Sequence, residues 1–191
     1  MGIGIKTGIM ALAGAGAGSA FSNVYSLALD GTDDKVTMGN VLDTSDTGAD
    51  ELSISLWLKT TDGSTQMLVA KMNNSTPFEG YNIAIVGTNK LSFFIGSFSG
   101  NNYIHAMSGA IANLSDGNWH HLVATYDGSR NANGVNIYLD NTSLSLTIIR
   151  NTPPIGAQNS QDFMIGARGT STANGSHFNG KIDEVAYFTS E

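Results

Sequence analysis

Residues 116–128, DGNWHHLVATYDG, bring together side chains that could take part in proton transfer. His120 and His121 are adjacent, with Asp116 before them and Asp127 after them. These are the residue types of a hydrolytic site, but successive side chains of a β-strand point to opposite faces. The two histidines therefore cannot converge on one ligand, and no serine stands in a Gly-x-Ser-x-Gly context. We expect a strand between two Asp-Gly turns, with one histidine inward and hydrogen-bonded and the other outward.

A pair of carboxylates would indicate a glycosidase, because retaining hydrolysis needs an acid and a nucleophile about 5 Å apart. The chain has only four glutamates, which are Glu51, Glu79, Glu184 and Glu191. Glu184 follows Asp183 directly, so their side chains face opposite sides of a strand. No local carboxylate pair can be assembled, and the sequence predicts that the protein is not an enzyme.

Three acidic residues in DGTDD (residues 30–34) are a candidate calcium site. Calcium takes six to eight oxygen ligands, and Asp30, Asp33 and Asp34 lie within one tight turn together with its carbonyl groups. The alternative is an acidic hairpin turn without a metal, since Asp-Gly turns are common between strands. A Ca²⁺ cofactor is therefore an expectation that rests on this turn.

Two predicted loops carry the residue types that bind sugars, which stack on aromatic rings and hydrogen-bond to Asn, Asp and Arg. The candidate carbohydrate-binding residues are Phe98, Asn101, Asn102 and Tyr103 in FSGNNYIH, and Arg168, Asn174 and His177 in ARGTSTANGSHF. The alternative is that the two aromatic residues complete the core and that the Asn/Gly runs are solvated turns.

The elements that would position these residues are short strands. In ELSISLWLK, Leu52, Ile54, Leu56 and Leu58 alternate with polar residues and Trp57, which is the period of a half-buried strand. Similar runs of four to nine residues follow one another, separated by clusters of Gly, Asn, Asp and Ser. We count eleven to thirteen strands and no sustained helical period. This number and spacing predict an all-β, jelly-roll β-sandwich of two antiparallel sheets.

Composition supports this class and limits the partners. Only 13% of the 191 residues are charged and 23 are glycine, which is unfavourable for long solvent-exposed helices. The formal net charge of −7 argues against binding to nucleic acid or to an anionic membrane. The chain has no cysteine, so it forms neither disulfides nor thiolate metal sites.

Residues 1–20, MGIGIKTGIMALAGAGAGSA, share no pattern with the rest of the chain. A lone lysine, an apolar centre and small residues are typical of a secretory signal, but glycines interrupt the apolar centre. Such an arm buries too little to offset the ordering of its backbone, which costs about 1–2 kcal/mol per residue. We therefore favour an arm that lies against a protein partner or a second copy in a homo-oligomer. The segment is too short and too rich in glycine for a membrane span.

Five motifs occur in the order SLALDGTDDKVTMG, ELSISLWLKT, GNWHHLVATYDGS, NIYLDN and FNGKIDEVAYF. In this the chain resembles laminin-G-like domains of the concanavalin A-like lectin/glucanase superfamily, from Phe21 to Glu191. The chain stops at FTSE, whereas family members often continue with a short tail. The resemblance implies a non-catalytic sandwich that serves in carbohydrate or protein adhesion. It also implies a calcium ion where the first and last strands meet, which would bring Asp183 close to Asp30, Asp33 and Asp34.

Two functions fit these observations. The first is a structural subunit of an extracellular or virion surface assembly, such as a bacteriophage decoration or fibre-associated protein, anchored by residues 1–20. The alternative is a secreted carbohydrate-binding module that is calcium-dependent. The lone domain, the arm and the small, acidic, disulfide-free composition favour the first function.

Overall fold

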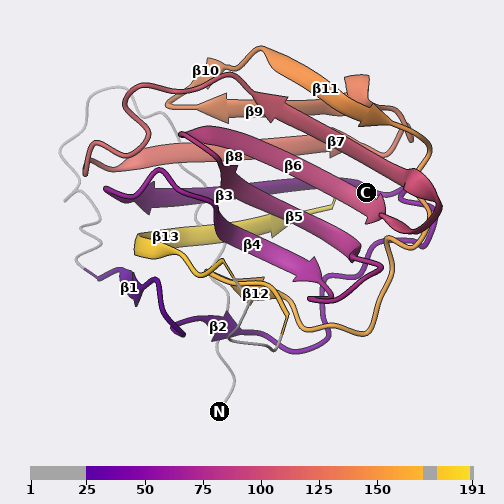
Figure 1. Ribbon diagram of the computed structural model, residues 1–191, viewed down its shortest axis with the longest axis horizontal. Helices are drawn as coiled ribbons and strands as arrows, with labels where there is room; N and C mark the ends of the chain where they lie inside the picture. Colours follow the sequence, from indigo (N-terminus) through magenta and orange to yellow (C-terminus); the bar gives the residue numbers. More distant parts are fainter. Residues whose placement is uncertain (1–24, 170–175, 190–191) are drawn as a thin grey trace, which may run out of the picture.

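The structure of the protein is a computed structural model that describes residues 25–169 and 176–189. Within them the chain forms strands β1 to β13 in two antiparallel sheets, one with six strands and one with seven. Figure 1 shows the sheets stacked on each other, with β4, β5 and β6 nearest the viewer. The all-β, two-sheet prediction is confirmed.

The six-stranded sheet has the order β1-β13-β3-β8-β9-β10. Its strands are β1 (Leu27–Asp30), β13 (Asn179–Phe188), β3 (Glu51–Lys59), β8 (His120–Asp127), β9 (Val135–Leu139) and β10 (Thr142–Ser143). The first strand therefore pairs with the last, as the family resemblance implies.

The seven-stranded sheet has the order β11-β7-β6-β5-β4-β12-β2. Its strands are β11 (Leu146–Asn151), β7 (Asn102–Ser108), β6 (Lys90–Ser97), β5 (Glu79–Val86), β4 (Gln66–Met72), β12 (Met164–Ile165) and β2 (Val36–Thr37). Strands β4 to β7 form a meander in which each strand pairs with the next.

The core lies between the sheets and takes alternate residues from the longer strands, because strand side chains alternate in direction. In β3 the predicted apolar face is confirmed, since Leu52, Ile54, Leu56 and Leu58 are all buried. They pack with the inward side chains of the other sheet, such as Phe93 of β6.

Helical structure in the described residues is confined to the 3₁₀ turns η1 (Ser99–Asn101) and η2 (Ala132–Gly134). None of the described chain forms a helix with the length and hydropathy needed to cross a bilayer. The turn η1 lies between β6 and β7 and carries part of the loop that was predicted to bind sugars.

Candidate functional site

The outer face of the seven-stranded sheet is the candidate site. Inward residues of β5, β6 and β7 enter the core, so their neighbours along each strand point outward. The register aligns Asn82 of β5 with Phe94 of β6, Phe94 with His105 of β7, and His105 with Arg150 of β11. A row of one amide, one phenyl ring, one imidazole and one guanidinium therefore crosses four adjacent strands.

Four aromatic rings gather around this row, and we call them the aromatic cluster: Phe78, Phe94, Phe98 and Tyr103. Phe98 stacks on Phe94 with ring centroids 4.9 Å apart, and it lies 4.6 Å from the Tyr103 ring. Phe78 meets Phe98 edge-on at 5.8 Å. Phe94 and Tyr103 are buried, but Phe98 is 43% exposed. The cluster thus offers one open ring supported by three others.

Two arginines border the aromatic cluster. The Arg150 guanidinium lies 5.4 Å from the Tyr103 ring centre, and its Nη2 donates to Asn101 Oδ1 at 3.2 Å. The Arg168 guanidinium lies 4.8 Å from the Phe78 ring centre. Its Nε is buried and has no hydrogen-bond partner. Both groups are therefore held against rings at the two sides of the cluster.

His105 and Asn82, the other two members of the row, are neutral. His105 Nε2 lies 2.9 Å from the Ser92 hydroxyl, and burial lowers the pKa of His105. Burial disfavours the charged imidazolium, so His105 is uncharged at neutral pH. Asn82 donates to Met72 Sδ at 3.3 Å.

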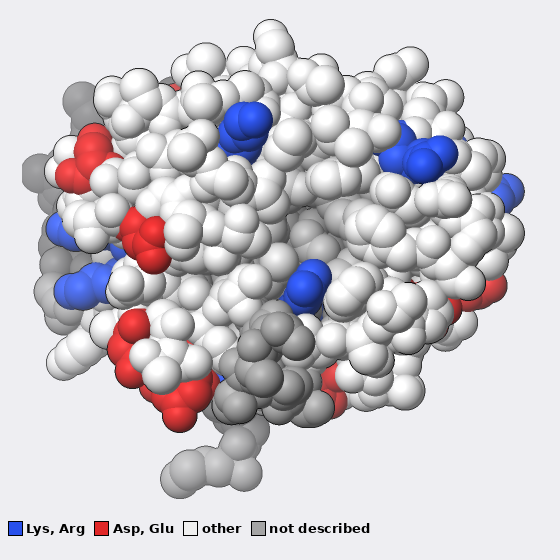
Figure 2. Space-filling view, viewed as in Figure 1, with Lys and Arg blue, Asp and Glu red and all other residues white. Residues whose placement is uncertain are grey.

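Figure 2 looks onto this outer face and shows that its centre is hollowed. Basic side chains stand around the hollow, whereas the acidic side chains in view lie towards the margins of the molecule. An exposed aromatic ring with guanidinium donors beside it is a combination found on ligand-binding surfaces.

The structure brings most of the predicted sugar-binding residues together. Phe98, Asn101, Tyr103 and Arg168 belong to the aromatic cluster or its border. Asn102 stands next to them at the start of β7, and its side-chain amide lies 3.5 Å from the Ser99 carbonyl. Of the other two predicted residues, His177 is 8% exposed and thus buried, and Asn174 lies outside the described residues.

The sequence reasoning missed the other residues of the row and the cluster, namely Phe78, Asn82, Phe94, His105 and Arg150. Strand alternation in LSFFIGSF would have separated the inward Phe93 from the outward Phe94. Arg150 had no such signal, because it reaches the face only through the pairing of β11 with β7.

The predicted directions of the two histidines, one inward and hydrogen-bonded and one outward, are confirmed. His120 is buried between two acids, with Nδ1 2.7 Å from Asp140 Oδ2 and Nε2 3.2 Å from Asp116 Oδ1. His121 faces outward, where its Nε2 lies 2.9 Å from the Ser55 hydroxyl. The two rings point to opposite faces and share no ligand position.

The acidic turn partly matches its prediction. Asp30, Asp33 and Asp34 present carboxylate oxygens within 4.8 Å of one another, and all three residues are exposed. Backbone amides already donate to Asp30 and Asp34, and the amide of Thr32 lowers the pKa of Asp30. Asp183 does not join the group, because the register aligns Leu27 with Ile182 and Asp30 with Asn179. Calcium binding at this turn stays a prediction.

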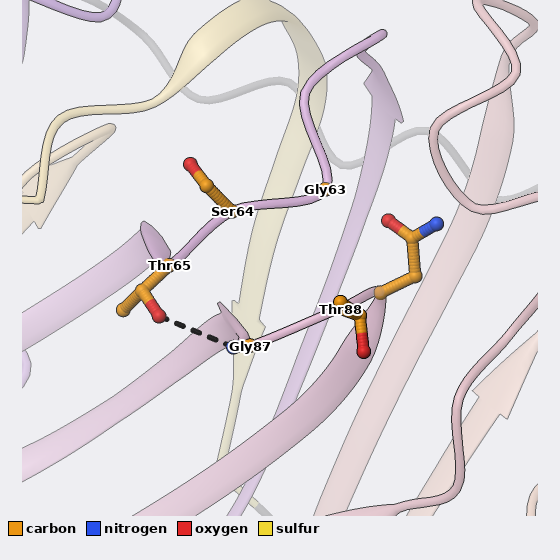
Figure 3. A pocket seen from close by; sticks show the side chains of 6 residues that line it. Gly63, Ser64, Thr65, Gly87 and Thr88 are labelled. Atoms are coloured by element: carbon orange, nitrogen blue, oxygen red, sulfur yellow. Dashed lines mark hydrogen bonds between the residues drawn. The ribbon is translucent and has the colours of Figure 1, made fainter.

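A pocket of about 510 Å³ lies elsewhere, between the turn before β4 and the turn between β5 and β6 (Figure 3). Its lining residues are Gly63, Ser64, Thr65, Gly87, Thr88 and Asn89. The Thr65 hydroxyl is already used as an acceptor for the Gly87 amide. No aromatic or charged side chain lines this pocket, so it offers a sugar no ring for stacking.

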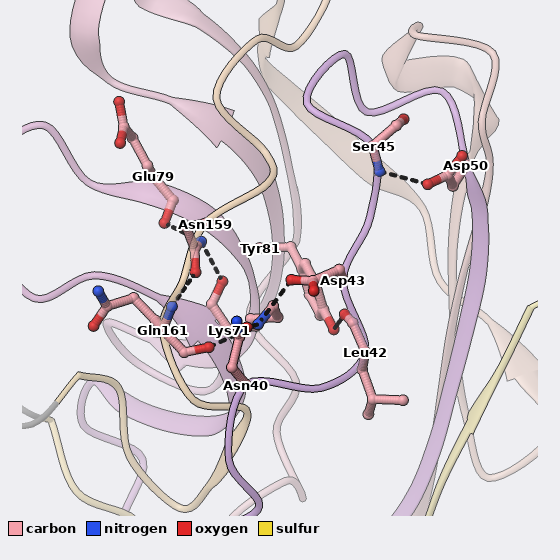
Figure 4. A network of polar contacts seen from close by, with 10 residues as sticks. All are labelled: Asn40, Leu42, Asp43, Ser45, Asp50, Lys71, Glu79, Tyr81, Asn159 and Gln161. Carbon is pink, nitrogen blue, oxygen red and sulfur yellow. Dashed lines mark hydrogen bonds and ion pairs between the residues drawn. The ribbon is translucent and has the colours of Figure 1, made fainter.

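Lys71 is fully buried on the inner side of β4 and does not reach the outer face. Its ammonium contacts the Asp43 carboxylate at 3.0 Å and donates to Asn40 Oδ1 at 2.6 Å and to the Gln161 carbonyl at 2.7 Å (Figure 4). Three acceptors satisfy its three N–H groups. Lys71 therefore fastens the segments after β2 and before β12 to the sheet.

The comparisons with known proteins agree with this fold. The model of the family described as the concanavalin A-like lectin/glucanases superfamily, Laminin_G_3, matches residues 30–191. The chain therefore belongs to this family. No curated protein sequence matches the chain.

Solved structures with this fold include the mouse laminin alpha1 chain, domains LG4-5, at 17% identity and a TM-score of 0.50. The alignment covers 86% of this chain and 41% of the laminin fragment, so the chain spans less than half of that fragment. The Ruminococcus gnavus IT-sialidase CBM40 is 12% identical, with a TM-score of 0.59, and the alignment covers 86% of this chain and 91% of the CBM40 chain. The botulinum neurotoxin serotype D binding domain is 13% identical, with a TM-score of 0.56. That alignment covers 85% of this chain and 39% of the neurotoxin chain.

Proposed function

We propose that the protein is a non-catalytic carbohydrate-binding module that serves in adhesion outside the cell or at its surface. Its binding surface is the aromatic cluster with Arg150 and Arg168 at its sides. The observation that carries this proposal is the exposed Phe98 ring, which is backed by Phe94 on the outer face of the sheet. A sugar ring can stack on Phe98 while its hydroxyls reach the neighbouring donors.

Structural neighbours support a binding role. The Ruminococcus gnavus CBM40 structures carry α2,3 and α2,6 sialyllactose, and the botulinum neurotoxin neighbour is described as a binding domain. Their identity to this chain is 10–13%, so they support the fold and leave the ligand to be determined from this chain's own residues.

The outer face also lacks what a glycosidase would need. Glu79 is the one acidic residue of β4, β5, β6, β7 and β11, and alternation places it on the same side as Tyr81, inside the sandwich. Among the described residues these strands therefore direct no carboxylate pair at a bound sugar, which supports a module that binds without hydrolysing.

The assembly role that the sequence favoured depends on residues 1–20, which lie outside the described residues. A virion or bacteriophage setting and anchoring through this arm therefore stay predictions. The aromatic cluster favours the carbohydrate-binding alternative, and the two roles are compatible, because a surface subunit can also adhere to glycans.

The substitution Phe98→Ala tests the proposal on an array of immobilised glycans. We expect the variant to lose about tenfold or more in affinity for every glycan that the wild-type chain binds, because an exposed aromatic anchor carries a large share of binding energy. Phe188→Ala is the matched control, since Phe188 is a 49% exposed phenylalanine at the end of β13 in the other sheet.

Thermal unfolding of both variants shows that they are folded before binding is compared. If Phe98→Ala and Phe188→Ala bind glycans as well as the wild-type chain does, the aromatic cluster is not the binding surface. If the wild-type chain binds no glycan, carbohydrate binding itself is wrong and the assembly role becomes the leading function.

A further inference from the structure

The charges of this protein are distributed unevenly along the sequence. The chain has 16 acidic residues, but Glu79 is the only one between Asp62 and Asp116, and there is none between Asp140 and Asp162. These two segments contain β4, β5, β6, β7 and β11 in full. Five adjacent strands of the seven-stranded sheet, from the edge strand β11 to β4, therefore come from the part of the sequence that is nearly free of acids.

Basic groups are present on the same face. Arg150 borders the aromatic cluster from β11, and Arg168 borders it from the segment after β12. Lys90 begins β6 on the same side of the sheet as Ser92 and Phe94, because strand side chains alternate. These basic groups thus lie on one face of a protein whose net charge is −7, and like charges gathered on a surface attract ligands of the opposite sign.

Neither guanidinium has a carboxylate partner among the described residues. The arginine side chain of Arg150 donates to a neutral amide, that of Asn101. Arg168 has a buried Nε without any partner, and burial lowers its pKa because desolvation disfavours the charged form. A partly desolvated cation gains most from a negatively charged ligand, which restores the interactions lost with water.

We propose that the ligand of the aromatic cluster is an acidic saccharide, whose carboxylate or sulfate group pairs with Arg150 or Arg168 while a sugar ring stacks on Phe98. This inference rests on the proposed carbohydrate-binding function. The planar guanidinium presents two parallel N–H donors, which match the paired oxygens of either anionic group.

The arrangement of the rings permits this contact. The Tyr103 ring contacts Phe98, and the Arg150 guanidinium lies over the Tyr103 ring. The Phe78 ring also contacts Phe98, and the Arg168 guanidinium lies over the Phe78 ring. Each guanidinium is thus one ring away from Phe98. A sugar stacked on Phe98 can reach one arginine through a charged substituent, and a longer oligosaccharide can reach both.

The test compares matched probes on the full-length chain by calorimetry or on a glycan array. Two pairs of probes are compared. The first pair is sialyllactose and lactose, and the second is chondroitin sulfate oligosaccharides and their desulfated forms. A panel of neutral oligosaccharides is measured beside them. Sialyllactose isolates a carboxylate and chondroitin sulfate adds sulfate, so the two arms distinguish the anionic groups. We expect an acidic probe to bind at least about tenfold more tightly than its neutral partner.

The variants are Arg150→Gln and Arg168→Gln, with Lys181→Gln as the matched control. Lys181 is an exposed cation on β13 of the other sheet, so its loss changes the net charge equally without touching the outer face. We expect at least one arginine variant to bind the acidic probe about tenfold more weakly, close to the level of the neutral probe. Lys181→Gln should bind like the wild-type chain.

Equal binding of acidic and neutral probes, or arginine variants indistinguishable from Lys181→Gln, would overturn the acidic ligand and leave the carbohydrate-binding function intact. If no probe of any charge binds, the proposed function fails and the inference fails with it. Raising the salt concentration provides a further check, because screening should weaken acidic probes and leave neutral probes unchanged.

Discussion

His120 combines two properties that seldom occur together in one side chain: it is nearly buried, and both of its ring nitrogens face carboxylates. Desolvation lowers its pKa, but the hydrogen bonds and charges of Asp140 and Asp116 outweigh this effect, so the pKa of His120 is raised above its ordinary value. The imidazolium therefore joins the start of β8 to the turn after β9. Its role is to hold the rim of the six-stranded sheet in place.

A raised pKa in the folded state makes this contribution depend on pH in a defined direction. Protonated His120 should stabilise the protein fully below the ordinary histidine pKa of about 6.5, and this stabilisation should fade as the pH rises through the folded-state pKa. We expect His120→Gln to lower the free energy of unfolding by about 1 kcal/mol below pH 6, and by less at pH 8. The value is modest because both carboxylates are partly exposed to solvent.

Urea unfolding of the wild-type chain and the variant across this pH range measures the effect. His121→Gln on the same strand is the control, since its ring faces the Ser55 hydroxyl and Trp57 and no carboxylate. A stability difference between wild type and His120→Gln that does not shrink as the pH rises would contradict the charged bridge.

At the scale of single strands, much of the architecture could be predicted, because alternation is a local property. The buried face of β3 and the opposed directions of His120 and His121 both followed from a period of two residues. The outer face could be predicted only in part. Phe98 and Tyr103 are close in sequence, but Arg150 and Arg168 join them through strand pairing and loop packing between distant segments, which no local pattern determines.

The pairing of β6 with β7 shows how a single glycine supports this face. Gly96 lies opposite Tyr103 and has a φ of +124°, in the region that favours glycine. A Cβ atom there would lie 2.4 Å from the Asn102 carbonyl oxygen and 2.8 Å from the Tyr103 Cα. Both are backbone atoms, so β7 itself would have to shift.

We therefore expect Gly96→Ala to lower the free energy of unfolding by about 1–3 kcal/mol, as a strained backbone conformation costs. It should also weaken glycan binding, because Tyr103 would move away from Phe98. Chemical denaturation measures the first effect and the glycan array measures the second. Gly109→Ala is the control, because its φ is ordinary and its added Cβ would meet nothing within 4 Å. An unchanged Gly96→Ala variant would show that β7 tolerates displacement.

At the scale of the whole molecule, the two faces of the seven-stranded sheet have different roles. The inner face supplies large buried side chains such as Tyr81 and Phe93 to one continuous core, which also contains residues of the other sheet. The outer face holds a separate, smaller group that includes Phe94, Tyr103 and Met72. Substitutions of the exposed Phe98 can thus alter binding while the core stays closed, so stability and ligand binding can be measured separately.

The same separation allows a test of residues 1–20, which the sequence predicts to contact a partner or a second copy. The described core already joins both sheets through residues 27–187, so we expect a chain without residues 1–20 to remain folded, with a thermal midpoint within a few degrees of the intact chain. Light scattering of both chains should then show a larger assembly only for the intact one, because a Gly/Ala segment needs an external surface to offset its ordering entropy.

Equal masses of the two chains would show that residues 1–20 do not drive self-association. A truncated chain that no longer folds would instead make the arm part of the domain.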